Sequence, residues 1–134
     1  MAQEPEPVIE FVDVHKTFGK QKVLNGLSMS IPKGYVTSVI GRSGTGKSVT
    51  LKHIMGLIKP DQGQILFDGN DVVRMREREL YQMRKRFGFL FQDSALFDSM
   101  SVFENVAFPL REHTRKKKPE VQEIVRAPCI ESNL

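Results

Sequence analysis

The segment Gly41-Arg42-Ser43-Gly44-Thr45-Gly46-Lys47-Ser48 decides the fold expected of this chain. It matches the phosphate-binding pattern G-x-x-x-x-G-K-[ST] at every specified position. In such a loop, glycines let backbone N–H groups approach an anion, the lysine reaches the β- and γ-phosphates of a nucleotide, and the hydroxyl residue ligates Mg²⁺. The segment therefore predicts a nucleotide site in which Lys47 contacts phosphate and Ser48 holds the metal ion.

The residues on either side of this segment support the prediction. Residues 35–40 are mostly β-branched and apolar, as in a buried strand. After Ser48, apolar residues recur at helical spacing as far as Ile58. A helix that begins at the end of the loop directs free N–H groups and the positive end of its dipole at the phosphates. An ordinary glycine-rich turn does not require this order of strand, loop and helix.

Length and composition are those of a single globular domain. The chain has 134 residues, of which 40% are hydrophobic and 27% are charged. Its one cysteine, Cys129, excludes an internal disulfide. No apolar run approaches the ~20 residues of a membrane-spanning helix. The acidic, proline-bearing residues 1–7 are expected to form a disordered lead-in and not a signal peptide.

The net charge of +4 arises from one local run. Residues 111–118 hold five basic side chains and one acidic side chain, and the rest of the chain holds 15 of each sign. A solvated surface segment explains this run more simply than contact with phosphates or lipid headgroups. We therefore expect no nucleic-acid partner. A second basic cluster, at residues 74–86, is interrupted by Glu77 and Glu79.

Two stretches ahead of the phosphate loop predict strands, at residues 8–14 and 23–31. The pair Asn25-Gly26 lies inside the second stretch and is typical of a hairpin or a bulge. No helix separates the two stretches, so they predict an antiparallel piece placed ahead of an α/β unit.

The second half of the chain alternates between helix and strand patterns. A short strand over 64–67 is followed by a turn in which Asp68 is expected to start the turn and not to hold Mg²⁺. A helix is predicted over 72–84 and a buried strand over 87–91.

Two helices are predicted near the end of the chain. Ser101 and Glu104 form a capping box, which predicts a helix start, and Pro109 is expected to limit that helix. Pro119 is expected to open a final short helix.

Together these segments resemble the first part of an ABC transporter ATPase subunit, over about Val8 to Leu110. The resemblance rests on the phosphate loop and on four further motifs: Phe18 about two dozen residues ahead of the loop, Val23-Leu24-Asn25-Gly26-Leu27-Ser28, Pro60-Asp61-Gln62-Gly63, and Phe91-Gln92. The run from Phe89 to Val106 is more narrowly similar to ATPases of bacterial phospholipid-trafficking importers, which maintain outer-membrane lipid asymmetry or confer organic-solvent tolerance.

The resemblance implies an α/β fold, a P-loop NTPase of ABC type. That fold has an antiparallel β subdomain and a parallel core sheet, here partial, and this chain would stop before the end of the helical subdomain. Residues 8–126 would form a partial nucleotide-binding domain, and residues 127–134 an atypical tail.

The resemblance also implies roles for individual residues. Residues 41–48 would bind Mg·ATP, and Phe18 would stack on adenine, the alternative being a core phenylalanine. Gln92 would join Lys47 in catalysis by approaching Mg²⁺ and the attacking water, the alternative being an exposed glutamine at a strand end. The apolar residues of the following loop either are buried in the core or dock a helix of a membrane subunit: Ala95, Leu96, Phe97 and Met100.

In this family ATP is sandwiched between two ATPase subunits, which act with a membrane permease on the cytoplasmic face of the cell membrane. The present sequence contains no Leu-Ser-Gly-Gly signature, no apolar run ending in Asp-Glu after Gln92, and no switch histidine. We therefore expect nucleotide binding at best. Poor solubility is also expected, because the strand at 35–40 would present an unpaired apolar edge.

Two other functions stay open on the sequence. One is a different P-loop enzyme, such as a small-molecule kinase, whose lid arginines would have to come from residues 74–86. The other is a non-catalytic nucleotide-binding module or an inert fragment.

Overall fold

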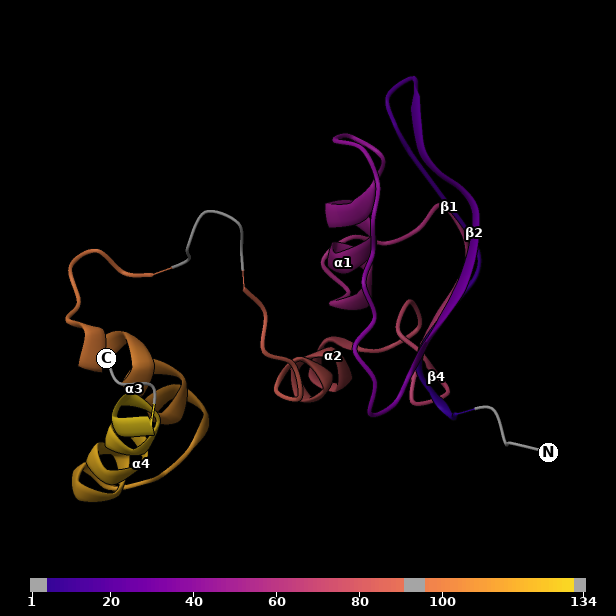
Figure 1. Cartoon of the computed structure of the whole chain (residues 1–134). Coiled ribbons are helices and arrows are strands. Elements are labelled where there is room, and N and C mark those ends of the chain that lie inside the picture. The colour runs from indigo at the N-terminus through magenta and orange to yellow at the C-terminus, as the bar shows by residue number, and fades with distance from the viewer. Residues whose placement is uncertain (1–4, 91–95, 132–134) are drawn as a thin grey trace. The chain divides into compact units, whose positions relative to one another are not determined.

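The computed structural model describes residues 5–90 and 96–131, and the side chains of residues 5–90 and 96–126 (Figure 1). The chain forms two compact units that divide between Arg84 and Lys85. No helix formed by the described residues is long and apolar enough to cross a bilayer.

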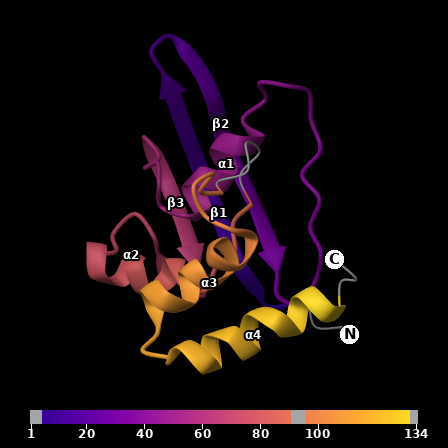
Figure 2. The same cartoon turned by 90° about the vertical axis from the view of Figure 1, so that its left-hand side faces the viewer.

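The first unit is built on a four-stranded antiparallel sheet (Figure 2). Its strands, in the spatial order β2-β1-β3-β4, are β1 (Pro7–Phe18), β2 (Gln21–Pro32), β3 (Gln62–Phe67) and β4 (Asn70–Asp71). Both strands predicted ahead of the phosphate loop are confirmed, and each is longer than predicted. They form one long hairpin that turns at residues 19–20.

Two local turn predictions are also confirmed. Asn25-Gly26 forms a bulge inside β2, because one extra residue separates the pairs Val14↔Leu27 and Lys16↔Leu24. Asp68-Gly69 is the two-residue turn between β3 and β4, with φ angles of 45° and 74°. Among the described residues no cluster of three or more histidine, cysteine or acidic side chains could hold a metal ion.

Helix α1 (Lys47–Ile54) and helix α2 (Glu77–Arg84) complete the first unit. α1 buries Thr50, His53 and Ile54. The apolar core of the unit consists of Ile9, Phe11, Val14, Leu24, Ile54, Ile65, Phe67, Val72, Leu80 and Met83.

α2 is shorter than the helix predicted over 72–84. The Asp71 side chain accepts a hydrogen bond from the Val73 N–H at 2.9 Å, which forms a local turn in place of helix. The helix begins only after the Arg76 N–H donates to the Glu79 carboxylate at 2.8 Å.

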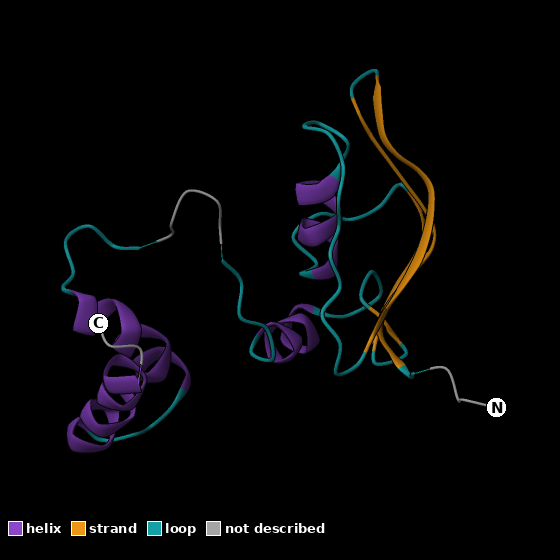
Figure 3. Cartoon of the chain, in the orientation of Figure 1, coloured by secondary structure: helices purple, strands orange, loops and turns teal. Residues whose placement is uncertain are grey.

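Two predicted strands do not form. Residues 35–40 are loop (Figure 3), and within them Val36 is 97% and Ile40 is 93% exposed. Residues 87–90, the described part of the strand predicted at 87–91, contain no strand either. A strand needs a neighbour to accept and donate its backbone hydrogen bonds, and no described segment pairs with either stretch. The described residues therefore form the antiparallel part of the predicted fold without its parallel part.

The second unit contains α3 (Val102–His113) and α4 (Lys118–Glu131). The predicted capping box is confirmed: the Ser101 hydroxyl accepts from the Glu104 N–H, and the Glu104 carboxylate accepts from the Ser101 N–H at 2.8 Å. α4 has Pro119 in its first turn, as predicted.

The prediction that Pro109 limits α3 is wrong, because the helix continues to His113. Ala107 on α3 packs with Val121 and Val125 on α4, all at most 3% exposed, and Phe103 and Leu110 pack against them. Burial of this face stabilises α3 on both sides of Pro109 and offsets the backbone hydrogen bond that proline removes.

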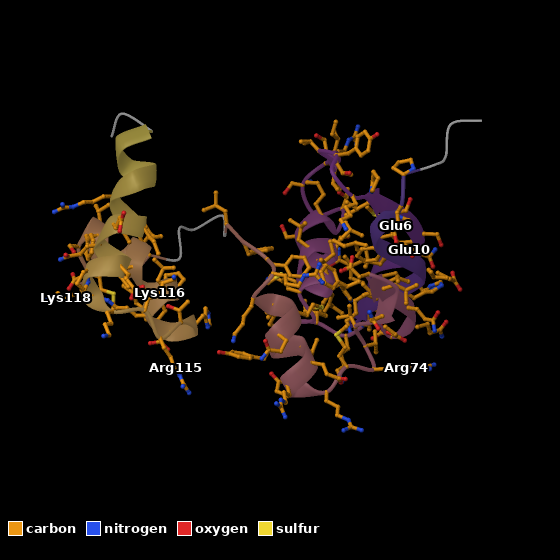
Figure 4. All side chains as sticks on the ribbon, turned by 90° about the horizontal axis from the view of Figure 1, so that it is seen from below. Glu6, Glu10, Arg74, Arg115, Lys116 and Lys118 are labelled. Atoms are coloured by element: carbon orange, nitrogen blue, oxygen red, sulfur yellow. The ribbon has the colours of Figure 1, made fainter. Side chains whose placement is uncertain are left out.

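The basic run at 111–118 is a solvated surface segment, as predicted. Every residue in it is exposed, including Arg115, Lys116 and Lys118, which are labelled in Figure 4.

The exposed apolar segment at 35–40 generates a prediction about solubility. We expect the unmodified chain to elute as aggregates in size-exclusion chromatography with light scattering. The double change Val36→Glu and Ile40→Lys should raise the monomeric fraction severalfold, because both side chains are almost fully exposed and contribute little packing. Leu57→Lys, at a half-exposed position outside the segment, is the matched control and should have a smaller effect. An unmodified chain that is monomeric with a sharp cooperative melt contradicts this prediction.

Candidate functional site

The phosphate loop is fixed to the sheet through its last glycine. Gly46 is buried, with φ of 92°, and a Cβ atom there would lie 3.0 Å from Val23 Cγ1 and 3.1 Å from the Val23 carbonyl oxygen. Glycine alone combines this backbone conformation with this close approach. The contact places the first turn of α1 directly against β2.

The start of α1 offers unpaired hydrogen-bond donors. The N-cap residue Gly46 has no side chain to cap the helix. Within the described part of the chain, the N–H groups of Lys47 and Ser48 have no acceptor, whereas the Thr50 N–H donates to the Gly46 carbonyl at 2.8 Å. Free N–H groups at the positive end of a helix dipole form a binding site for an anion.

The Lys47 ammonium lies at the loop itself. Its Nζ donates to the carbonyl oxygens of Gly41 at 2.8 Å and Arg42 at 2.6 Å. None of the ion pairs among the described residues includes Lys47. An ammonium has three donors, so one is left for an external acceptor and the positive charge is not neutralised. The Thr45 hydroxyl also donates to the Arg42 carbonyl, at 2.8 Å, which keeps the loop folded around Lys47.

The structure therefore brings the predicted residues 41–48 together around one set of donors. Ser48 is exposed in the first turn of α1, where its hydroxyl is open to a cation bound beside an anion. The N–H and ammonium donors fit a triphosphate, and the Ser48 hydroxyl oxygen fits a divalent metal ion. Gln92 lies outside the described residues, so its proposed catalytic and metal-binding role stays a prediction.

Phe18 ends β1 and is 45% exposed, so the alternative that it is a core residue is wrong. The Lys16 ammonium lies over its ring, 5.4 Å from the centroid. The hairpin turn that follows Phe18 and the loop that leads into α1 lie at the same end of this unit (Figure 1). Phe18 thus stands at the hairpin end of β1, and the loop that leads into α1 lies at that same end of the unit (Figure 1).

Sequence reasoning missed the contacts that hold the other end of α1. The Arg84 side chain donates from Nε to the Met55 carbonyl at 3.0 Å and from Nη2 to the Gly56 carbonyl at 3.1 Å. A guanidinium at the carbonyl end of a helix satisfies free acceptors and complements the dipole. No local signal distinguishes Arg84 from the other arginines of residues 74–86, because its partners lie 28 and 29 residues away.

His53, in the last turn of the phosphate-loop helix α1, is fully buried. Its Nδ1 is 2.7 Å from the Val49 carbonyl oxygen, and its Nε2 is buried with no partner among the described residues. Burial lowers the pKa of His53, and the hydrogen bond to Val49 opposes this only in part. The folded state therefore favours the neutral imidazole.

The loop ahead of α3 presents an apolar groove of about 350 Å³. Leu96 is 66% and Phe97 is 46% exposed, so the alternative that these two residues are buried in the core is wrong; Ala95 lies outside the described residues. Asn105 fixes the loop by donating to the carbonyls of Phe97 and Met100 and by accepting from the Phe97 N–H. No local sequence pattern indicates this role of Asn105.

Comparison with known proteins establishes the family. The family model described as ABC transporter matches residues 24–131, most of the chain. The chain belongs to the ABC transporter family. Among curated proteins, it is 49% identical over 117 residues to the "Probable ribonucleotide transport ATP-binding protein mkl" of Mycobacterium leprae (strain TN), covering 87% of this chain and 34% of that protein.

A second relative agrees with the narrower resemblance. The chain is 44% identical over 119 residues to the "Intermembrane phospholipid transport system ATP-binding protein MlaF" of Escherichia coli (strain K12), covering 89% of this chain and 44% of that protein. The resemblance to phospholipid-trafficking ATPases is therefore confirmed. The chain spans less than half the length of these relatives.

Solved structures confirm the fold. A dimeric ATP-binding cassette in a post-hydrolysis state, bound to ADP and Pi, superposes with a TM-score of 0.80 at 28% identity, covering 92% of this chain and 56% of that one. The chain thus has the fold of ABC ATPase cassettes, to which its antiparallel sheet and P-loop helix belong.

The buried imidazole of His53 predicts a pH-dependent stability. The folded-state pKa is below the ordinary value of about 6.5. The unfolded chain therefore binds more protons than the folded chain below about pH 6.5. Stability should be complete above that pH and fall as the pH drops through the lowered folded-state pKa. His53→Leu should flatten the dependence of the melting temperature between about pH 7.5 and 5, because it removes the titrating group.

The measurement is calorimetry in the Val36→Glu, Ile40→Lys background. His113→Gln changes an exposed histidine and is the control, which should keep the original pH dependence. If His53→Leu and the parent show the same slope, the buried imidazole is not responsible.

Proposed function

We propose that this chain forms the nucleotide-gripping part of an ATPase subunit that powers an ABC transporter by binding and hydrolysing ATP. One observation supports the proposal: residues 41–48 combine unpaired N–H groups at the start of α1 with the uncompensated ammonium of Lys47, which bonds to the Gly41 and Arg42 carbonyls of the same loop. ABC ATPases bind ATP, and a triphosphate is the anion that such a loop accepts.

The residues of the loop would share the work of binding and charge stabilisation. The N–H groups of residues 44–48 would bind phosphate oxygens, and Lys47 would stabilise the negative charge that spreads over the transferring phosphoryl group. Ser48 and Gln92 would hold Mg²⁺, which when bound neutralises charge on the phosphates. Phe18 would stack on the adenine base and contribute to affinity without changing the chemistry.

We propose lipid or another hydrophobic solute as the transported class. The support is the similarity to proteins named as phospholipid transport ATPases, at 44% and 48% identity. A membrane permease and a second ATPase subunit would be the partners, with the chain peripheral on the cytoplasmic face of the membrane. The groove lined by Leu96, Phe97 and Val106 is the surface on which a permease helix would dock, because its apolar residues are exposed on a loop held by Asn105.

The nucleotide site can be tested by titration with a fluorescent ATP analogue in the presence of Mg²⁺. We expect Lys47→Ala to weaken binding by about tenfold or more, because it removes a charge-assisted contact with phosphate. Lys52→Ala removes an exposed lysine from the last turn of the same helix and should bind like the parent. Equal affinities of the Lys47→Ala variant and the parent would refute the site.

Turnover is a separate prediction. The 134 residues contain no ABC signature and no metal-binding aspartate with adjacent catalytic glutamate after Gln92. We therefore expect phosphate release by the chain alone to equal that of its Lys47→Ala variant. A release rate that clearly depends on Lys47 would show that these 134 residues suffice for hydrolysis.

A further inference from the structure

A carboxylate remote in sequence holds the end of β1 that carries Phe18. Asp61 precedes β3 and contacts three consecutive residues of β1. Its Oδ1 accepts from Lys16 Nζ at 2.8 Å, its Oδ2 accepts from the Thr17 N–H at 2.7 Å, and its own N–H donates to the His15 carbonyl at 2.9 Å. Both carboxylate oxygens are thus used.

These contacts lie just beyond the point where β1 stops pairing with β3. Along this edge of β1, pairing with β3 ends at His15↔Gln62, whereas pairing with β2 continues to Phe18↔Gln21. The Thr17 N–H would otherwise face solvent. The carboxylate of Asp61 replaces the missing strand as acceptor and extends the ordered edge to the residue next to Phe18.

The same carboxylate places a cation on the aromatic ring. Residues 16 and 18 lie on one face of the strand because their positions differ by two. Lys16 keeps only 15% of its side chain exposed, and its ammonium is held between Asp61 and the Phe18 ring, 5.4 Å from the centroid. Lys16 is the principal reason that the pKa of the Asp61 carboxyl is lowered, with a further contribution from the Thr17 N–H. The carboxylate therefore stays ionised at neutral pH.

We propose that Asp61 is a positioning residue for the nucleotide base: through Lys16 and the Thr17 N–H it fixes the Phe18 ring in the orientation on which a purine stacks. This inference rests on the proposed nucleotide site and concerns its base-binding part. The ammonium lies over one ring face, so the other face is the one offered to the base. Without Asp61, the last residues of β1 and the Lys16 side chain lose their shared anchor.

The test compares two ligands that differ in the base. Binding of Mg·ATP and of magnesium tripolyphosphate is measured by calorimetry on the full chain, fused to a solubility carrier. Phe18→Ala should weaken ATP by about fivefold or more, as expected for loss of a stacked base, and leave tripolyphosphate unchanged. Asp61→Asn should weaken ATP by about threefold or more and likewise leave tripolyphosphate unchanged. Asp61→Glu, which restores the charge, should recover part of the loss.

Two further variants sharpen the result. In the Phe18→Ala background, Asp61→Asn should cause no additional loss, because the ring on which it acts is gone. Glu10→Gln removes an acidic side chain from the same strand, away from the site, and should bind both ligands like the parent.

The outcomes separate the two proposals. If Lys47→Ala leaves both ligands bound as tightly as before, the nucleotide site itself fails and this inference fails with it. If Phe18→Ala weakens ATP but Asp61→Asn does not, only the role of Asp61 is overturned. Equal losses of ATP and tripolyphosphate on Asp61→Asn would also overturn it, because Asp61 would then support the fold of the whole unit.

Discussion

The contact between Gly46 and β2 is the constraint on which the rest of the first unit depends. A helix start supplies an anion site only if its N–H groups stay free and its axis is fixed. Gly46 meets both needs, because it has no side chain to cap the helix and because it lies so close to Val23 that even a Cβ atom would be crowded there. The Thr50 hydroxyl, buried beneath it, donates to the Gly46 carbonyl at 2.9 Å and ties the first turn together.

The two ends of α1 differ in whether their free backbone groups have hydrogen-bond partners. At its carboxyl end, Gly56 adopts φ of 63°, the Gly56 N–H donates to the His53 carbonyl, and Arg84 takes up two carbonyls. At its amino end the N–H groups of Lys47 and Ser48 have no partner among the described residues. The carbonyl groups at the C-terminal end of α1 are thus bonded, whereas the N–H groups at its N-terminal end are free to bind an anion.

Sequence patterns predicted the features that depend on neighbouring residues. The helix after the phosphate loop, the Asn25-Gly26 bulge and the Ser101 capping box are each set within a few residues, and each formed as predicted. The strand at 35–40 did not form, because a strand depends on a partner that local composition cannot supply. The helix through Pro109 continued for the converse reason: a distant apolar face, on α4, stabilised what the local rule disfavours. Contacts made by Arg84 and Asn105 were missed because no spacing rule identifies their partners.

The start of β3 shows why two motifs far apart in the chain come into contact. Gly63 has φ of 90°, and a Cβ atom there would lie 2.3 Å from the Asp13 carbonyl oxygen, so only glycine lets β3 approach β1 at that point. That approach brings Asp61, two residues earlier, within reach of Lys16 and Thr17. The Pro60–Gly63 motif and Phe18, which appear as separate motifs in the sequence, are therefore connected in the structure through Asp61 and Lys16. Gly63 lets β3 approach β1 closely. At this separation Asp61 accepts hydrogen bonds from Lys16 and Thr17, and the Lys16 ammonium lies over the Phe18 ring.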